Sequence, residues 1–160
     1  MNKINLKNIT ENLLETFFKA GQIAKEISLR GVKITIKEDK SPVTDGDIAV
    51  DNILRNKIQS ITPDIPIISE ETVNFNTENK NKDFWLVDPI DGTRDYIKKG
   101  EEYTLNAALI INLKPAAGII YAPAKNRLFY SYGKHLAYEI RNEKTFKLNC
   151  EKKNKNEIIG

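Results

Sequence analysis

Cysteine, histidine, tryptophan and methionine each occur only once in the 160 residues. The single thiol, Cys150, cannot form a disulfide within the chain, so we expect a reducing compartment and interpret Cys150 as a small packing residue. No apolar run approaches the ~18 residues of a membrane span, and the first residues lack the hydrophobic segment of a signal peptide. The sequence therefore predicts a cytoplasmic protein without a membrane span.

The sequence also lacks a large excess of positive or negative charge, because the net charge is only +3. Basic residues gather only near the C-terminus, at Lys144, Lys147, Lys152, Lys153 and Lys155. Residues 151–160 contain no aromatic side chain that could stack on bases, so we interpret them as a solvated Lys/Asn-rich tail and expect no nucleic-acid partner. The remaining residues, 1–150, suffice for one domain, since a chain of this length buries about 70% of its unfolded surface.

Apolar residues recur at helical spacing in two segments. They are three or four positions apart over residues 6–29, and the pattern ends near Gly31. A second helix is predicted after Thr44, because Asp47 three positions later completes a capping box and apolar residues follow at helical spacing up to Ile61.

Short apolar or alternating runs predict strands at residues 32–36, 66–68 and 84–87. Five more strands are predicted over residues 103–113, 116–121, 127–132, 136–141 and 145–148, separated by turn residues that include Lys114–Pro115, Gly133 and Asn142. Short turns between successive strands favour an antiparallel meander. The predicted fold is therefore α+β, with two helices packed on one antiparallel sheet.

Two carboxylates follow the apolar run Phe84–Val87, in the sequence Asp88-Pro89-Ile90-Asp91-Gly92-Thr93. Hard cations such as Mg²⁺ take oxygen ligands and are commonly held by one or two carboxylates together with waters and substrate phosphate. A pair of aspartates with no histidine or cysteine nearby therefore indicates a divalent-metal phosphatase site.

The backbone of the same segment suits both a metal and a phosphate. Pro89 cannot donate to a sheet ladder, so we expect the strand to stop there and leave the Ile90 carbonyl free to face an ion. Gly92 lets a backbone N–H approach an anion, and a helix that begins at Thr93 would favour a phosphate beside the metals.

Two upstream segments supply further carboxylates. The short apolar strand Pro66–Ile68 is followed by Ser69-Glu70-Glu71-Thr72, and Ser41–Asp47 leads into the second predicted helix with Asp47 in its first turn. Three turns that carry carboxylates are then available to converge on one site.

Together, Asp-Pro-Ile-Asp-Gly-Thr at 88–93, Ser-Glu-Glu at 69–71 and Ser-Pro-Val-Thr-x-x-Asp at 41–47 resemble the inositol monophosphatase superfamily of Mg²⁺-dependent, Li⁺-sensitive phosphomonoesterases. Residues 91–97, 102–106 and 118–123 look most like the bacterial 3′(2′),5′-bisphosphate nucleotidases within it, since inositol monophosphatases more often carry Asn in place of Asp95. The resemblance covers the chain from about the first helix to about Asn149.

The resemblance implies a role for each matching residue. Glu70, Asp88 and the Ile90 carbonyl would hold one metal, and Asp88 would bridge to a second metal shared with Asp91. Two or three Mg²⁺ ions are implied, and Mn²⁺ is expected to substitute for them. Asp47 and Thr93 would orient and deprotonate the attacking water, while the backbone of Gly92 and Thr93 would contact the substrate phosphate.

The implied reaction is release of the 3′-phosphate from adenosine 3′,5′-bisphosphate or its sulfated relative by metal-activated water. The alternative enzymatic function is that of an inositol monophosphatase or sugar-phosphate phosphatase, which would use the same metal site. The non-enzymatic alternative is a remnant that binds metal but catalyses no reaction. In the first two cases the partner is a small phosphate ester such as an adenosine bisphosphate or an inositol phosphate.

One departure from the superfamily concerns length. The resemblance implies a second half with a Trp-Asp-x-Ala-Ala-like motif, whose Asp completes the second metal site. No Asp follows Asp95 and no Trp follows Trp85. We therefore expect either the N-terminal portion of a longer protein or a shortened product, with weak Mg²⁺ binding, little turnover and self-association through a bare sheet edge.

Four other residues are assigned structural roles, and a fifth, Glu71, is left open. Asp45 is expected to be a cap or turn residue, and Glu71 is left open between a metal ligand and a supporting residue. His135 is expected on the surface in a turn, and Trp85 and Tyr96 in the core.

Overall fold

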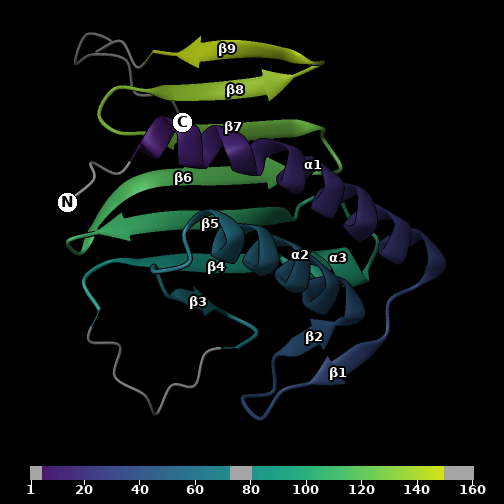
Figure 1. The fold of residues 1–160 in the computed structure, drawn as a ribbon. Helices are drawn as coiled ribbons and strands as arrows, with labels where there is room; N and C mark the ends of the chain where they lie inside the picture. The colour runs from purple at the N-terminus through teal and green to yellow at the C-terminus, as the bar shows by residue number, and fades with distance from the viewer. Residues whose placement is uncertain (1–4, 73–80, 150–160) are drawn as a thin grey trace, which may run out of the picture.

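The computed structural model describes residues 5–72 and 81–149, which form the helices and strands drawn in Figure 1. The helices are α1 (Leu6–Arg30), α2 (Asp45–Ile61) and the short α3 (Thr93–Ile97). Strands β1 (Ile34–Ile36) and β2 (Pro42–Thr44) pair antiparallel as a separate small sheet. None of the described helices is long and apolar enough to cross a membrane.

The main sheet has seven strands in the order in which they occur along the chain (Figure 1). They are β3 (Ile67–Ser69), β4 (Phe84–Asp91), β5 (Thr104–Ile111), β6 (Lys114–Ala122), β7 (Arg127–Tyr132), β8 (Ala137–Arg141) and β9 (Lys144–Leu148). Strands β4 to β9 form the predicted antiparallel meander, and β3 joins its edge parallel to β4.

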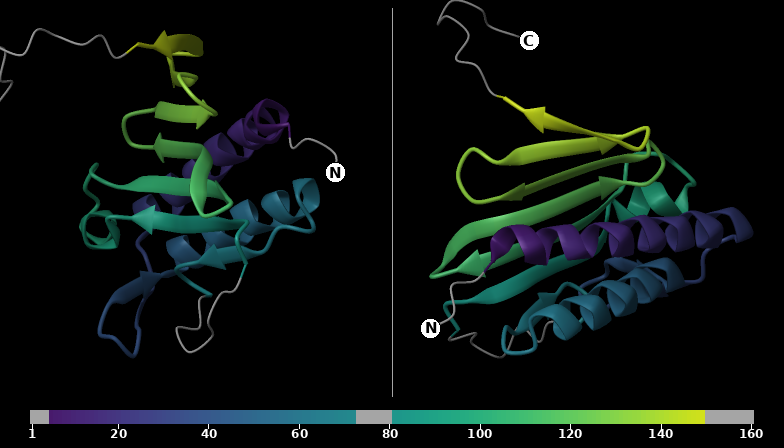
Figure 2. Two further views of the ribbon diagram at one scale, coloured as in Figure 1. Left: turned by 90° about the vertical axis from the view of Figure 1, so that its left-hand side faces the viewer. Right: turned by 45° about the horizontal axis from the view of Figure 1, so that its top comes forward.

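Both long helices lie on one face of this sheet, as the right-hand view of Figure 2 shows. Helix α1 packs on β6 and β7, and α2 packs on β4. Alternate residues of the strands, such as Trp85, Leu105 and Ile119, point into this layer and are at most 1% exposed. The hydrophobic core therefore lies between the two helices and one face of the sheet, as the predicted α+β class requires.

Local sequence explains where the helices begin and end. The Asn5 side chain caps α1 by accepting from the Asn8 backbone N–H, and Gly31, with a φ of 94°, follows its last turn. Thr44 and Asp47 form the predicted capping box at the start of α2. Both helices thus follow the predicted boundaries closely.

The opposite face of the sheet, here called the open face, carries no described helix (Figure 2). Several of its large apolar side chains remain exposed, for example Leu86 at 43% and Ile120 at 50%. A contiguous apolar surface of this kind usually marks an interaction site.

Three local expectations are corrected. Strand β4 continues to Asp91 instead of stopping at Pro89, because the ladder with β5 absorbs the proline by shifting register between Asp88 and Asp91. The hairpin turn falls at Asn112–Leu113, and Lys114 and Pro115 already belong to β6. The predicted strand at 32–36 shortens to Ile34–Ile36, all of it exposed. Cys150 and residues 151–160 lie outside the described residues, so the proposed boundary at residue 150 stays a prediction.

Candidate active site

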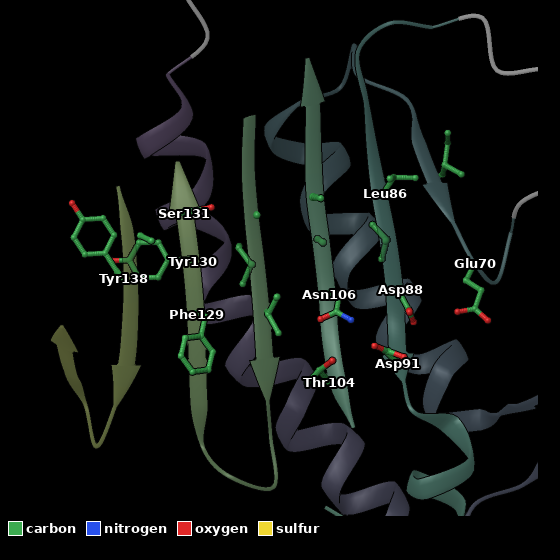
Figure 3. A pocket seen from close by; sticks show the side chains of 18 of the residues that line it. Glu70, Leu86, Asp88, Asp91, Thr104, Asn106, Phe129, Tyr130, Ser131 and Tyr138 are labelled. Atoms are coloured by element: carbon green, nitrogen blue, oxygen red, sulfur yellow. The ribbon is translucent and has the colours of Figure 1, made fainter. Parts of the chain in front are cut away.

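The parallel pairing of β3 and β4 brings two carboxylate-bearing segments to the same edge of the sheet. Ser69 at the end of β3 pairs with Val87, and the Glu70 backbone N–H donates to the Val87 carbonyl at 3.0 Å. Glu70 therefore follows β3 at the level where Asp88 follows Val87. Figure 3 shows Glu70, Asp88 and Asp91 together at this edge.

A cavity of about 790 Å³ extends from these acids across the open face. Thr104 and Asn106 of β5 line it beside Asp88 and Asp91, and Figure 3 shows Phe129 and Tyr138 toward its other end. The cavity thus has an acidic end that suits a cation or a cation-bound phosphate, and an apolar remainder.

Asp88 is the most strongly perturbed acid of this cavity. Burial, followed by the negative charges of Glu70 and Asp91, raises the pKa of Asp88 from 3.8 to about 7. Its Oδ1 atom is buried and accepts no hydrogen bond from the described residues. A buried oxygen that lacks a donor and is crowded by like charges fits a divalent cation, whose ligands are hard oxygens.

The register shift after Asp88 leads into the turn that carries the remaining candidates. Gly92 adopts the left-handed region, with φ 94° and ψ 31°, and α3 begins at the next residue, as predicted. The Thr93 hydroxyl lies 3.0 Å from the Ile90 carbonyl oxygen and hydrogen-bonds to it. A carbonyl oxygen has a second lone pair, so this bond leaves Ile90 capable of facing an ion.

Asp47 and Thr93, the pair to which the resemblance gives a role toward water, are in contact. The Thr93 Oγ1 atom lies 3.3 Å from Asp47 Oδ1, although the residues are far apart in the sequence. Asp47 is only 2% exposed, and its Oδ2 accepts from both the backbone N–H and the hydroxyl of Thr44. Burial raises the pKa of Asp47, while the hydrogen bonds from Thr44 partly oppose that rise.

Lys37, at the end of β1, is a cation that sequence reasoning missed. Its Nζ lies 2.9 Å from Glu71 Oε1 and 3.6 Å from Glu70 Oε1. Partial burial lowers the pKa of Lys37, but the hydrogen bond and charge of Glu71, together with Glu70, outweigh it and raise the pKa. Burial likewise raises the pKa of Glu71, against the effect of Lys37. Glu71 is therefore engaged by Lys37 in this structure.

Two more polar groups near the site had only weak signals in the sequence. Asn106 alternates with Thr104 on β5, which places both on the open face. Asp51 lies one helical turn after Asp47 on α2, and it is buried with Ser69. Either could have been found only by knowing which face of its element turns toward the acids.

The structure places the other assigned residues as expected. Asp45 accepts from the Lys33 backbone N–H and pairs with Arg30, so it is a structural residue. His135 is exposed in a turn. Trp85 and Tyr96 are buried, and they donate to the Thr62 hydroxyl and the Ala24 carbonyl respectively.

The acids converge without forming a tight cluster. Within residues 5–72 and 81–149, no three His, Cys, Asp or Glu side chains are close enough to hold a metal as they stand. Like charges repel at short range, so carboxylates without a cation between them are expected to lie apart. The type of donor fits a divalent cation, and the side chains of Glu70 and Asp91 are both exposed.

Comparison with known proteins identifies the same architecture. The family described as the inositol monophosphatase family matches residues 5–159. A relative from Buchnera aphidicola, named 3′(2′),5′-bisphosphate nucleotidase CysQ, is 36% identical over 143 residues, which are 82% of this chain and 54% of the relative.

Solved structures agree with this match. CysQ from Bacteroides thetaiotaomicron is 26% identical with a TM-score of 0.62, over 94% of this chain and 53% of that one. Staphylococcal inositol monophosphatase-1, solved as a LiCl-soaked inhibitory complex, shares the fold with a TM-score of 0.76 and 19% identity, over 86% of this chain and 52% of that one. The chain spans about half the length of the relatives it matches.

Proposed function

This chain belongs to the inositol monophosphatase family, and from that membership we propose that it carries the cation-binding and water-activating groups of a Mg²⁺-dependent phosphomonoesterase. The observation that supports the proposal best is Asp88, a half-buried carboxylate whose Oδ1 atom is buried without a hydrogen-bond partner among the described residues, beside Glu70 and Asp91. Such an arrangement is unfavourable unless a cation compensates the charge.

Each residue has a proposed role. Glu70, Asp88 and the Ile90 carbonyl would hold one cation, and Asp88 and Asp91 would contribute to holding another. When bound, the cations acidify a coordinated water and stabilise the attacking and leaving oxygens of the displacement. The backbone N–H groups of Gly92 and Thr93 bind and orient the phosphate.

Asp47 and Thr93 act on the water. The Thr93 hydroxyl has a single proton, which can point to the Ile90 carbonyl at 3.0 Å or to Asp47 Oδ1 at 3.3 Å. When it donates to Asp47, its oxygen can accept a hydrogen bond from the water, and Asp47 is itself fixed by two hydrogen bonds from Thr44. Burial favours the protonated form of Asp47, so this side chain is suited to take up a proton during the reaction. The pair therefore positions the water and receives its proton.

We propose adenosine 3′,5′-bisphosphate as the substrate, with an inositol phosphate as the alternative. The relatives named 3′(2′),5′-bisphosphate nucleotidase support the first. Asp95, the residue that favoured this branch in the sequence, accepts from the Glu102 backbone N–H at 2.8 Å. It therefore shapes the loop between α3 and β5, whose residues Glu101 to Thr104 border a second, smaller cavity beside Asp91 and Gly92.

Phosphate release from adenosine 3′,5′-bisphosphate and from inositol 1-phosphate, with Mg²⁺ and with a chelator, tests the proposal. We expect slow, Mg²⁺-dependent release that favours the bisphosphate and is lost in Asp88→Asn. Release that persists in the chelator would contradict the proposal. Cation binding without turnover of either ester would instead support a non-catalytic, metal-binding remnant.

A further inference from the structure

Asp51 is a buried acid with no part in the proposed chemistry. It is 3% exposed and lies on α2 four residues after Asp47, so the two carboxylates leave the same side of the helix. An acid with so little exposure requires partners, because an uncompensated buried charge is strongly destabilising.

Both oxygens of Asp51 are engaged, each by a different element. Oδ1 accepts a hydrogen bond from the hydroxyl of Ser69, a residue with no exposed surface. Oδ2 lies 3.3 Å from Nη1 of Arg55, one turn further along α2. Arg55 therefore compensates the charge of Asp51 from within the helix, and Ser69 connects the helix to the sheet.

Ser69 is also the residue from which the acidic turn begins. Its carbonyl accepts from the Thr72 backbone N–H at 3.0 Å, and its hydroxyl lies 3.4 Å from the Glu71 backbone N–H. The turn that presents Glu70 and Glu71 is thus tied to Ser69, and through Ser69 to Asp51.

We infer that Asp51 is a positioning residue, which holds the Ser69–Thr72 turn so that Glu70 faces Asp88. Helix α2 then sets two parts of the site at once, with Asp47 contacting Thr93 and Asp51 contacting Ser69. The inference rests on the proposed function in so far as Glu70 is taken as a cation ligand. Groups that support metal ligands in this way typically change affinity by about 10-fold to 100-fold when removed.

A matched control separates positioning from general stability. Thr62, at the end of α2, is buried, and its hydroxyl accepts from the Trp85 indole on β4 at 3.0 Å. Thr62→Val removes a buried hydrogen bond between the same helix and the sheet, away from the acids. It should lower the free energy of unfolding without altering the Ser69–Thr72 turn.

The experiment uses the full 160-residue chain and Mn²⁺ as the probe. We expect Asp51→Ala and Ser69→Ala each to weaken Mn²⁺ binding about tenfold, and the double variant to be no weaker than either, since both remove the same bond. Asp51→Asn, which keeps the volume and can still accept from Ser69, should lose less. Thr62→Val should keep the wild-type affinity at a comparable loss in urea midpoint. Wild-type affinity in Asp51→Ala, or additive losses in the double variant, would overturn the inference.

A second measurement needs no metal. In the metal-free chain, Asp51→Ala and Ser69→Ala should shift the backbone amide resonances of Glu70 and Glu71, whereas Thr62→Val should not. Unshifted resonances overturn the positioning role even if Mn²⁺ binds. Shifted resonances in a chain that binds no Mn²⁺ support the positioning role and contradict only the proposed function.

Discussion

Asp88 on β4 lies directly opposite Asn106 on β5 in the antiparallel ladder, and the Oδ1 atom of each is buried without a hydrogen-bond donor among the described residues. Most buried polar atoms in native structures have a partner. Two unpartnered acceptors on paired residues therefore indicate a group that both oxygens are arranged to receive, and a cation or a donor from the substrate satisfies that requirement.

Asp88→Asn should remove most of the affinity for Mn²⁺, because the proposed bridging carboxylate contributes to both cation sites. It should also raise the urea midpoint of the metal-free chain, because it removes the repulsion from Glu70 and Asp91. Calorimetry and urea unfolding measure the two effects. Asp45→Asn, a change of a nearby acid with a structural role, should leave Mn²⁺ affinity unchanged. Unchanged affinity in Asp88→Asn would exclude Asp88 from the site.

In a full-length context, Asp47→Asn should lower turnover by about 10²-fold to 10⁴-fold, the usual contribution of a general base, while Mn²⁺ affinity stays close to that of the wild type. Thr93→Val should act in the same direction, because it removes the hydroxyl that links the water to Asp47. The measurements are kcat for phosphate release and Mn²⁺ affinity on the same samples. Loss of Mn²⁺ binding in Asp47→Asn would identify Asp47 as a ligand instead.

The raised pKa of Asp88, about 7 against an ordinary 3.8, makes stability depend on pH. Between these values the folded chain binds more protons than the unfolded chain, so this contribution to stability is present at low pH and is lost as the pH rises toward 7. The difference in urea midpoint between wild type and Asp88→Asn should therefore grow from about pH 4 to about pH 8 in metal-free buffer. Mg²⁺ should reduce it at the upper end. A difference that does not change with pH would contradict the shift.

Lys37→Met should increase the affinity for Mg²⁺ or Mn²⁺ by a few fold, because the Lys37 ammonium occupies the carboxylates of Glu70 and Glu71 at 3.6 and 2.9 Å. The same change should lower the melting temperature of the metal-free chain, since it leaves these acids without their counter-charge. Lys33→Met, at an exposed lysine of the same segment, is the control. Weaker cation binding in Lys37→Met would show that Lys37 supports the site and does not compete with the cation.

Self-association should take place through the open face of the sheet, not through its β9 edge. Exposed Lys144 and Lys147 on β9 discourage strand pairing, whereas Leu86 and Ile120 expose apolar surface. Leu86→Ser with Ile120→Ser should reduce the average mass seen by sedimentation velocity. Leu29→Ser, at an α1 leucine that is 77% exposed, should not. A wild-type chain that stays monomeric at all concentrations would contradict this prediction.

Much of this fold could be predicted because its signals are local. The apolar spacing of α1, the Thr44–Asp47 capping box and the short turns of the meander are each contained in a few neighbouring residues. The parallel pairing of β3 with β4 was not predicted, because pairing between separate segments depends on packing across the whole sheet. The extension of β4 past Pro89 was missed for the same reason, since the register shift arises only once β5 is paired.

Part of the candidate site could likewise be predicted from local sequence signals, and part could not. The carboxylates at 70, 88 and 91 follow apolar strands, so their clustering could be expected from the sequence. The contact of Asp51 with Ser69 and that of Lys37 with Glu71 join a helix or a small hairpin to a turn. Nothing near these residues in the sequence indicates their partners, and only the assembled layers bring them together.

The backbone conformation and close packing at Gly92 restrict which residues this position can accept. A Cβ atom at this position would lie 2.6 Å from the Glu102 backbone carbonyl oxygen, at a φ of 94° that side chains rarely adopt. Because the obstacle is backbone, no second-site change of a side chain can make room. We therefore expect substitution of this glycine to displace the turn that carries Asp91 and Thr93, and we expect selection to retain glycine at this position.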